Sequence, residues 1–173
     1  DVYSQVKMWD VIIYNYLREK NIQIPMLHRQ EKSEAYAGAY VKDPQVGLHK
    51  WVVSFDLNSL YPHLIMQYNI SPETIVGMSE THPGVDNMLE KSYDTDFLSG
   101  KNQTMTPNGA LFSRDKHGFL PELMQQMYTD RSATKKQMLQ ASQQYESTGD
   151  VQYKNMIPKL HNKQMALKIA LNS

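Results

Sequence analysis

Two long stretches with apolar residues at helical spacing, joined by a short turn, constrain the fold of this chain most. The first stretch covers residues 121–144 and the second covers residues 154–173, with turn-forming residues at 147–150 between them. Pro158 fits the first turn of the second helix better than its middle. Because two long helices with a short connection pack side by side, the pattern predicts an antiparallel helical hairpin.

The rest of the chain mixes helical and strand patterns. We expect helices at residues 5–20 and 61–69, strands at residues 36–41 and 51–55, and an irregular stretch at residues 71–120 with a short hairpin near residues 109–112. Strands followed by a separate helical hairpin predict an α+β fold.

Asp56 stands where the second predicted strand should end, and the polar residues that follow it are typical of a tight turn. A carboxylate beside free backbone N–H groups can hold a metal ion and a polyphosphate together. An aspartate in this position is also typical of a helix cap or a turn, and spacing alone favours that interpretation.

The predicted hairpin carries cations on both helices. Arg131 and Lys135 are one helical turn apart on the first helix, so they share a face. On the second helix, Gln164, Lys168 and Asn172 form a polar stripe, and its back is apolar, with Met165, Leu167, Ile169 and Leu171. The two stripes could converge on a triphosphate. The residue pattern by itself favours a solvated charged face.

Composition excludes several classes of protein. The 173 residues carry no net charge and no cysteine, which excludes a disulfide framework and a thiolate zinc site. The six histidines show no paired ligand spacing, and no phosphate-binding P-loop sequence occurs. No apolar run could span a membrane, and no signal sequence precedes the first helix. Residues 114–168 hold nine Lys and Arg against five Asp and Glu, so one face can still be basic.

Longer motifs identify a family. Residues 56–62, Asp-Leu-Asn-Ser-Leu-Tyr-Pro, resemble the first palm motif of family B DNA polymerases. Residues 69–74, Asn-Ile-Ser-Pro-Glu-Thr, resemble the T-even-type phage replicative polymerases of that family. Residues 163–173 are similar to the fingers motif, whose pattern is Lys-x-x-x-Asn-Ser. His63 is a departure, because the family usually has a small hydroxyl residue there.

The resemblance implies a role for each matching residue. Asp56 and the Leu57 carbonyl would hold two Mg²⁺ ions together with a second carboxylate that this chain lacks. The nucleotide would be bound by Ser59, Leu60, Tyr61, Arg131, Lys135, Lys168 and Asn172, with Tyr61 beneath the deoxyribose and Gln164 on the template side.

Tyr93-Asp94-Thr95-Asp96 resembles the second carboxylate motif of the family but does not qualify as it. The glycine between the tyrosine and the first aspartate is missing, and the family places that motif after the fingers. We therefore expect Asp94 and Asp96 to be exposed loop acids that form Asx turns.

The resemblance implies template-directed DNA synthesis in replication by an internal piece of a viral polymerase that is inactive by itself. Residues 1–35 would follow an upstream exonuclease domain, residues 36–120 would form part of the palm, and residues 121–173 a truncated fingers hairpin. Primer-template DNA, dNTPs and a sliding clamp are the implied partners, inside the cell. The alternative is a non-catalytic module that binds nucleotides or nucleic acid.

Overall fold

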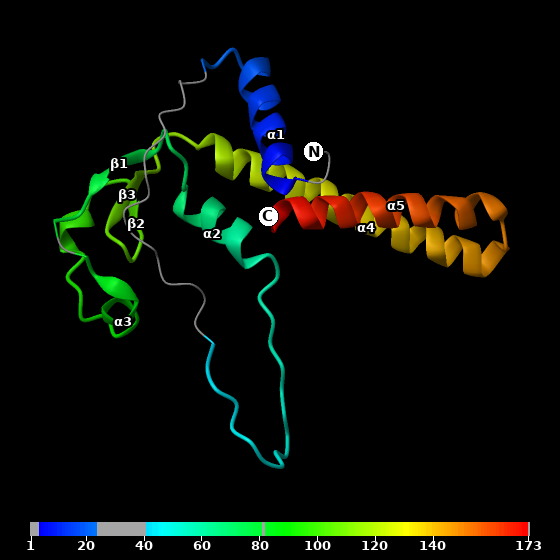
Figure 1. The fold of residues 1–173 in the computed structure, drawn as a ribbon, viewed down its shortest axis with the longest axis horizontal. Helices are drawn as coiled ribbons and strands as arrows, with labels where there is room; N and C mark the ends of the chain where they lie inside the picture. The colour runs from blue at the N-terminus through cyan, green and yellow to red at the C-terminus, as the bar shows by residue number, and fades with distance from the viewer. Residues whose placement is uncertain (1–3, 24–40, 81, 173) are drawn as a thin grey trace. The chain divides into compact units, whose positions relative to one another are not determined.

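The computed structural model describes residues 4–23, 41–80 and 82–172, and the chain forms two compact units, Asp1–Leu57 and Asn58–Ser173 (Figure 1). The described elements combine helices with one three-stranded sheet, which confirms the predicted α+β class.

The first unit contains one described helix, α1 (Gln5–Glu19), which confirms the helix predicted at residues 5–20. It begins at Ser4, whose side chain accepts a hydrogen bond from the Lys7 N–H at 3.4 Å. A serine at this position satisfies a backbone donor that the helix itself leaves free. Leu17 is the buried apolar residue of this helix among its described side chains.

The strand predicted at residues 51–55 is wrong, because this segment has no regular secondary structure. Trp51 is 97% exposed and Phe55 is 91% exposed, although the sequence suggests a buried strand. A strand is stabilised by hydrogen bonds and side-chain contacts with neighbouring strands, and within the described residues nothing pairs with this segment. The strand predicted at residues 36–41 lies outside the described residues except for Val41, which belongs to no strand.

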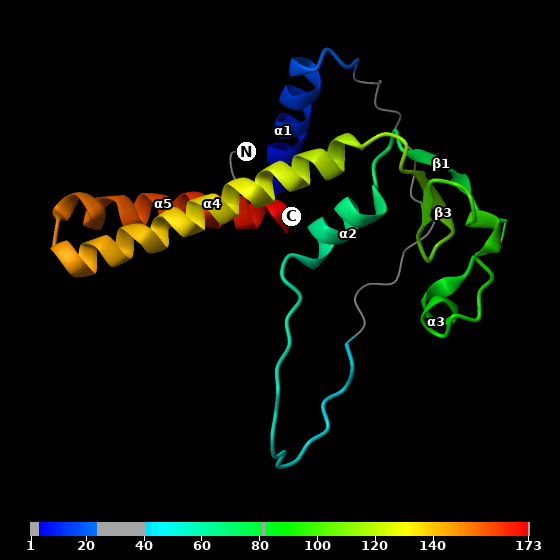
Figure 2. The same ribbon diagram turned by 180° about the vertical axis from the view of Figure 1, so that it is seen from behind.

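The second unit begins with helix α2 (Leu60–Tyr68), which confirms the helix predicted at residues 61–69. The stretch that follows is more regular than the sequence predicts. It contains β1 (Ile75–Met78), α3 (Gly84–Leu89), the 3-10 turn η1 (Asp96–Leu98), β2 (Gln103–Met105) and β3 (Ala110–Ser113). The antiparallel β2–β3 pair confirms the predicted hairpin, and β1 joins the other edge of β3 (Figure 2).

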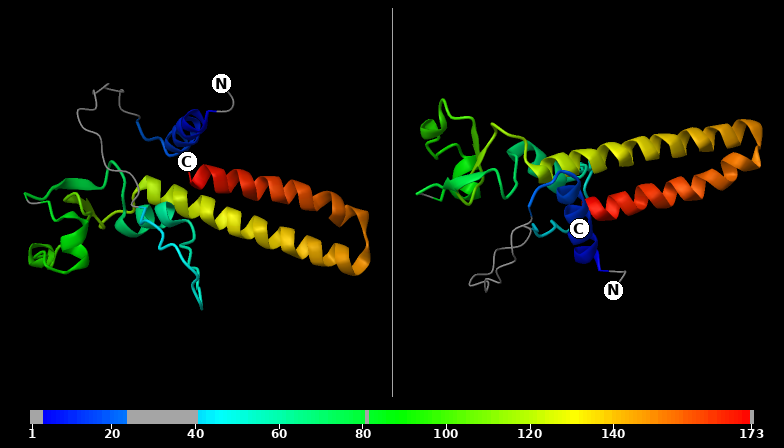
Figure 3. Two further views of the ribbon diagram at one scale, coloured as in Figure 1. Left: turned by 60° about the horizontal axis from the view of Figure 1, so that its bottom comes forward. Right: turned by 90° about the horizontal axis from the view of Figure 1, so that it is seen from above.

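Helices α4 (Phe119–Thr148) and α5 (Val151–Leu171) run antiparallel and side by side, which confirms the predicted hairpin (Figure 3). Gly149 ends α4 with φ of 69°, a left-handed conformation that glycine adopts without steric cost. The Asp150 carboxylate accepts the Gln152 N–H at 2.8 Å and caps α5. The first-turn placement of Pro158 is wrong: α5 starts at Val151, so the proline lies inside the helix.

The core of the second unit has two parts. Met105, Ala110 and Phe112 are buried on the sheet. Leu123, Met124, Met127, Ala141, Ala170 and Leu171 are buried on the helical hairpin. The helix α2 packs against α4, and its Pro62 is among the most buried side chains. The packing of α2 on α4 brings the predicted phosphate-binding turn and the predicted cationic helix into one unit.

Candidate functional site

The turn at the start of α2 presents backbone donors. Ser59 precedes the helix in a left-handed conformation, with φ of 52° and ψ of 51°, and makes no side-chain cap hydrogen bond. The first N–H groups of a helix have no partner within the helix. Leu60 and Tyr61 are 41% and 67% exposed, so the first turn of α2 lies at the surface. This end of α2 is therefore suited to an anion.

Asp56 and Leu57 end the first unit, and both are exposed. The N-cap position of α2 is occupied by Ser59 and not by Asp56. The helix-cap interpretation of Asp56 is therefore wrong. Among the described residues, no three His, Asp or Glu side chains gather into a group that could hold a metal ion.

His63 connects the start of α2 to α4. Its imidazole Nδ1 lies 2.9 Å from the Ser59 carbonyl oxygen, so this nitrogen carries the proton and donates. The imidazole also meets the Tyr128 ring edge to face, with ring centroids 4.9 Å apart and an interplanar angle of 82°. Tyr128 precedes Arg131 by one helical turn on α4. The turn at Ser59 is thus linked to the cationic helix through one side chain.

Arg131 and Lys168 lie at the same level of the hairpin. Arg131 and Lys168 are nearly the same number of residues from Gly149, and both helices rise about 1.5 Å per residue. Arg131 is half-buried, and in the described part of the chain its Nε atom is buried without a hydrogen-bond partner. Lys135 and Lys168 are exposed, as is Asn172, which ends α5. A buried guanidinium nitrogen without a partner is costly unless a ligand supplies an acceptor.

The stripe on α5 differs from its prediction. Gln164 is only 7% exposed and shares the packed face with Leu171, whereas Ile169, predicted on the apolar back, is 47% exposed. The reason is the helical repeat: residues seven apart, such as Gln164 and Leu171, fall on nearly the same face. The structure therefore separates Gln164 from the exposed Lys168 and Asn172.

Asn69 organises the junction between α2 and α4. It ends α2 in a left-handed conformation with φ of 56° and is 5% exposed. Its side-chain Nδ2 donates to the carbonyl oxygens of Ser113 at 2.7 Å and Lys116 at 2.8 Å. Its Oδ1 accepts the Gly118 N–H at 2.9 Å. One amide therefore satisfies three backbone groups directly before α4 begins.

The residues after Asn69 cap α4 from outside the helix. Glu73 accepts the Phe119 N–H through Oε1 and the Ser71 hydroxyl through Oε2, both at 2.5 Å. A carboxylate at a helix N-terminus also interacts favourably with the helix dipole. Gly118 approaches the same loop so closely that an added Cβ would lie 2.6 Å from the Ser71 Cβ. Residue spacing did not assign these roles. The signal available in the sequence was the Asn-Ile-Ser-Pro-Glu-Thr run itself, because most of it lies outside the predicted helices.

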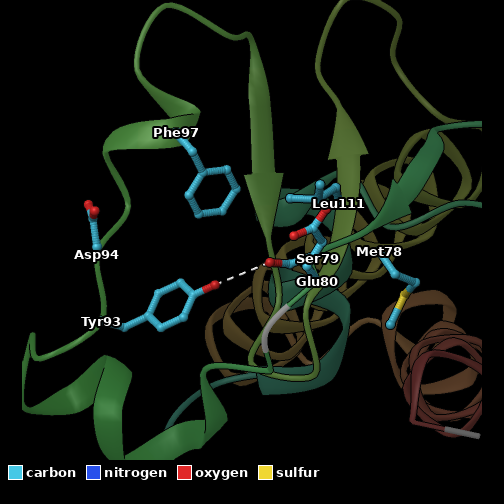
Figure 4. Close-up of a pocket in the computed structure, with 7 residues that line it drawn as sticks. All are labelled: Met78, Ser79, Glu80, Tyr93, Asp94, Phe97 and Leu111. Carbon is cyan, nitrogen blue, oxygen red and sulfur yellow. Dashed lines mark hydrogen bonds between the residues drawn. The ribbon is translucent and has the colours of Figure 1, made fainter.

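Two clefts of the second unit lie apart from the predicted residues. One of about 210 Å³ borders the Asn69 junction and is lined by Met66, Asn69, Arg114, Lys116 and His117, so it is basic. The other, of about 470 Å³, lies beside the sheet, where Tyr93 and Phe97 meet edge to face and Tyr93 Oη is 3.1 Å from Ser79 Oγ (Figure 4).

The acids beside the second cleft behave as predicted. Asp94 Oδ1 accepts the Asp96 N–H at 2.8 Å, and both residues are exposed. This is the Asx turn expected of loop acids, which is confirmed.

Comparison with known proteins gives consistent matches. Residues 3–173 match the model of DNA polymerase family B. The chain is 38% identical over 143 residues to the DNA-directed DNA polymerase of Escherichia phage RB69, covering 81% of this chain and 15% of the relative. It is 34% identical over 137 residues to that of Enterobacteria phage T4, covering 79% of this chain and 15% of the relative. A DNA polymerase of Pyrococcus horikoshii is 34% identical over 141 residues, covering 81% of this chain and 9% of the relative.

The chain therefore spans about 15% of the length of the phage relatives it matches. None of the helices in the described parts of the chain is long and apolar enough to cross a membrane.

Proposed function

Because this chain belongs to DNA polymerase family B, we propose that it forms the nucleotide-binding part of a DNA-directed DNA polymerase. The reaction is nucleotidyl transfer, in which the primer 3′-oxygen bonds to the α-phosphorus of a dNTP and the bond to pyrophosphate breaks. Primer-template DNA and dNTPs are the substrates, and the proposed setting is replication inside the cell. A sliding clamp as a further partner stays a prediction from the resemblance.

One observation carries the proposal. Arg131 and Lys168 lie at the same level of the helical hairpin, while the start of α2 belongs to the same unit and α2 packs against α4. Cations from two helices and backbone N–H groups from a third are the groups that neutralise and orient a triphosphate.

The start of α2 supplies the contacts to the phosphates and the sugar. Ser59 and Leu60 offer backbone N–H groups to the β- and γ-phosphates. Tyr61 presents an exposed ring on which the deoxyribose lies, and the ring leaves no room for a 2′-hydroxyl. Specificity for deoxynucleotides then follows from the steric exclusion of a ribose.

The hairpin supplies the charge. Arg131, Lys135 and Lys168 neutralise the triphosphate, and Asn172 donates from the end of α5. Gln164 on the template side stays a prediction, which its burial on the packed face of α5 does not favour. Movement of α4 and α5 toward the bound nucleotide would couple charge neutralisation to correct base pairing.

The metal site is only partly formed by this chain. The Asp56 carboxylate and the Leu57 carbonyl are oxygen donors, which is the ligand class that Mg²⁺ prefers, so their chemistry fits. Two donors fill only part of a Mg²⁺ coordination shell, and the remaining ligands are proposed to come from another part of the polymerase and from the substrates. When bound, two Mg²⁺ ions supply neutralisation of negative charge at the reacting phosphate.

The test compares two acids in the complete polymerase. Asp56→Ala should abolish primer extension, because removing a metal-binding carboxylate leaves the reacting phosphates without their main positive charge. Asp94→Ala is the matched control, since Asp94 is an exposed loop acid in the same chain. Extension is measured with a labelled primer and all four dNTPs. Near-normal extension by Asp56→Ala would refute the proposed metal role.

A non-catalytic binding module remains the second candidate, because the cleft lined by Arg114, Lys116 and His117 adds cations that need no metal. Such a module binds nucleotide with the same affinity in Mg²⁺ and in EDTA. A polymerase site loses most of its dNTP affinity when Mg²⁺ is removed, so equilibrium binding in the two buffers separates the candidates.

A further inference from the structure

His63 makes two contacts that together reach both sides of the proposed triphosphate site. Its Nδ1–H donates to the Ser59 carbonyl oxygen at 2.9 Å, and its ring lies against the Tyr128 ring. The Ser59 carbonyl also accepts the His63 backbone N–H at 3.2 Å, which is the first hydrogen bond of α2. The Ser59 carbonyl oxygen therefore accepts two hydrogen bonds from His63, and the one from the imidazole is the shorter.

That carbonyl controls the direction of the Leu60 N–H. Ser59 C=O and Leu60 N–H belong to one trans peptide unit, in which the two bonds point in opposite directions. When the carbonyl oxygen is held toward His63, the Leu60 N–H points out of the start of α2. A hydrogen bond to the carbonyl also polarises the peptide and strengthens the N–H as a donor.

The turn has a reason to need this support. Ser59 is in the left-handed region, with φ of 52° and ψ of 51°, although it is not a glycine. This conformation is strained for a non-glycine residue, so it persists only where surrounding contacts hold it. His63 supplies such a contact from one helical turn away.

We propose that His63 is a positioning residue that orients the Leu60 N–H toward the β- and γ-phosphates and ties this turn to α4 through Tyr128. The inference rests on the proposed function, because it assumes that the start of α2 binds a triphosphate. It assigns His63 a role that no other part of the site provides among the described residues. The ligand is a dNTP in the forward reaction and pyrophosphate in the reverse reaction.

Three substitutions separate the two contacts of His63. His63→Ala removes both contacts. His63→Ser keeps a donor, since a serine hydroxyl can bond to the carbonyl four residues earlier in a helix. His63→Phe keeps a ring for Tyr128 and has no donor. All three are made in the complete polymerase, and thermal unfolding checks that each variant folds.

We expect His63→Ala and His63→Phe to raise the KM for dNTP and for pyrophosphate about fivefold, since a charge-assisted hydrogen bond is weakened but not lost. The kcat and the Kd for primer-template should stay within about twofold of the wild type, and His63→Ser, which keeps the donor but loses the ring, should raise both KM values by less than His63→Ala does. Unchanged KM values in His63→Ala would overturn the inference. A lowered kcat with an unchanged KM in His63→Ala, which a purely structural role predicts, would also overturn it. A third contrary result would be a normal KM for dNTP in His63→Phe together with a raised KM in His63→Ser.

A second measurement tests the link to α4. Tyr128→Ala should raise the KM for dNTP in the wild type but add little in the His63→Ala background, because the contact is then already lost. Full additivity of the two effects would overturn the coupling through Tyr128.

Lys168→Ala in the same assays separates this inference from the proposed function. If Lys168→Ala raises the KM for dNTP while His63→Ala does not, only the role of His63 is overturned. If neither variant changes the KM, the triphosphate site itself is wrong.

Discussion

The segment from Trp51 to Phe55 is rich in apolar residues, and the junction around Asn69 contains a family motif. Only the junction is packed. Trp51 and Phe55 are more than 90% exposed, whereas Asn69 and Ser71 are 5% and 2% exposed. The junction finds its partners within its own unit, since Asn69 bonds to residues that directly precede α4. A strand needs a neighbouring strand, and the described residues offer none at Trp51–Phe55.

The two regions differ in whether the described residues include the partners that hold them in place. The junction is held by side-chain hydrogen bonds whose donors and acceptors all belong to this chain. The segment before Asp56 carries the pattern of a buried strand, but the described residues contain no strand that pairs with it. We therefore expect substitutions at the junction to affect the stability of the second unit, and substitutions in the segment to matter only where a sheet is available.

The largest effect on stability is expected for Asn69→Ala. The substitution leaves two carbonyl oxygens and one N–H without their partner, which we expect to cost about 3 kcal/mol in the free energy of unfolding. Urea denaturation of the 173-residue chain measures the loss. Asn69→Gly is the control, because glycine keeps the left-handed conformation but lacks the amide. Recovery of stability in the glycine variant would show that conformation matters and that the three hydrogen bonds do not.

A smaller effect is expected for Gly118→Ala. The new Cβ would lie 2.6 Å from the Ser71 Cβ, so the start of α4 must shift, at a cost of about 2 kcal/mol. Ser71→Gly removes the obstructing atom, so the double variant should lose less stability than the sum of the two single variants. Additive losses would indicate that Ser71 and Gly118 are not in contact.

The smallest effect is expected for Val53→Ser in the 173-residue chain. Val53 is 70% exposed, so the free energy of unfolding should change by less than about 0.5 kcal/mol. In the complete polymerase the same substitution should cost about 2 kcal/mol if the segment joins a sheet there. A large loss in the 173-residue chain would contradict the exposed conformation of this segment.

Sequence patterns predicted the local elements well. The helical hairpin, α1, α2 and the β2–β3 hairpin follow from helical spacing and turn residues that lie close together in the chain. The strand β1 and helix α3 were not predicted, because each is short and β1 is mostly exposed, so neither carries a clear periodic signal. Pro158 was placed in the first turn because the helix was expected to begin near Lys154 rather than at Val151.

For the candidate site, the motifs identified the residue types, and the structure supplied their surroundings. The pairing of Arg131 and Lys135 on one helix could be derived from spacing. Burial of Gln164 and exposure of Ile169 could not, because they depend on which side of α5 faces α4. His63 could be recognised in the sequence as a departure from the family pattern, but its contacts with Ser59 and Tyr128 could not.

The sequence by itself determined the helical hairpin, the turn after Asp56 and the family, because each depends on residues that are near neighbours in the chain. Only the tertiary structure decided that Asn69, Ser71 and Glu73 hold the start of α4 and that His63 joins α2 to Tyr128. These contacts join residues up to 65 positions apart, from His63 to Tyr128. Their partners are chosen by how the elements pack, which no local pattern specifies.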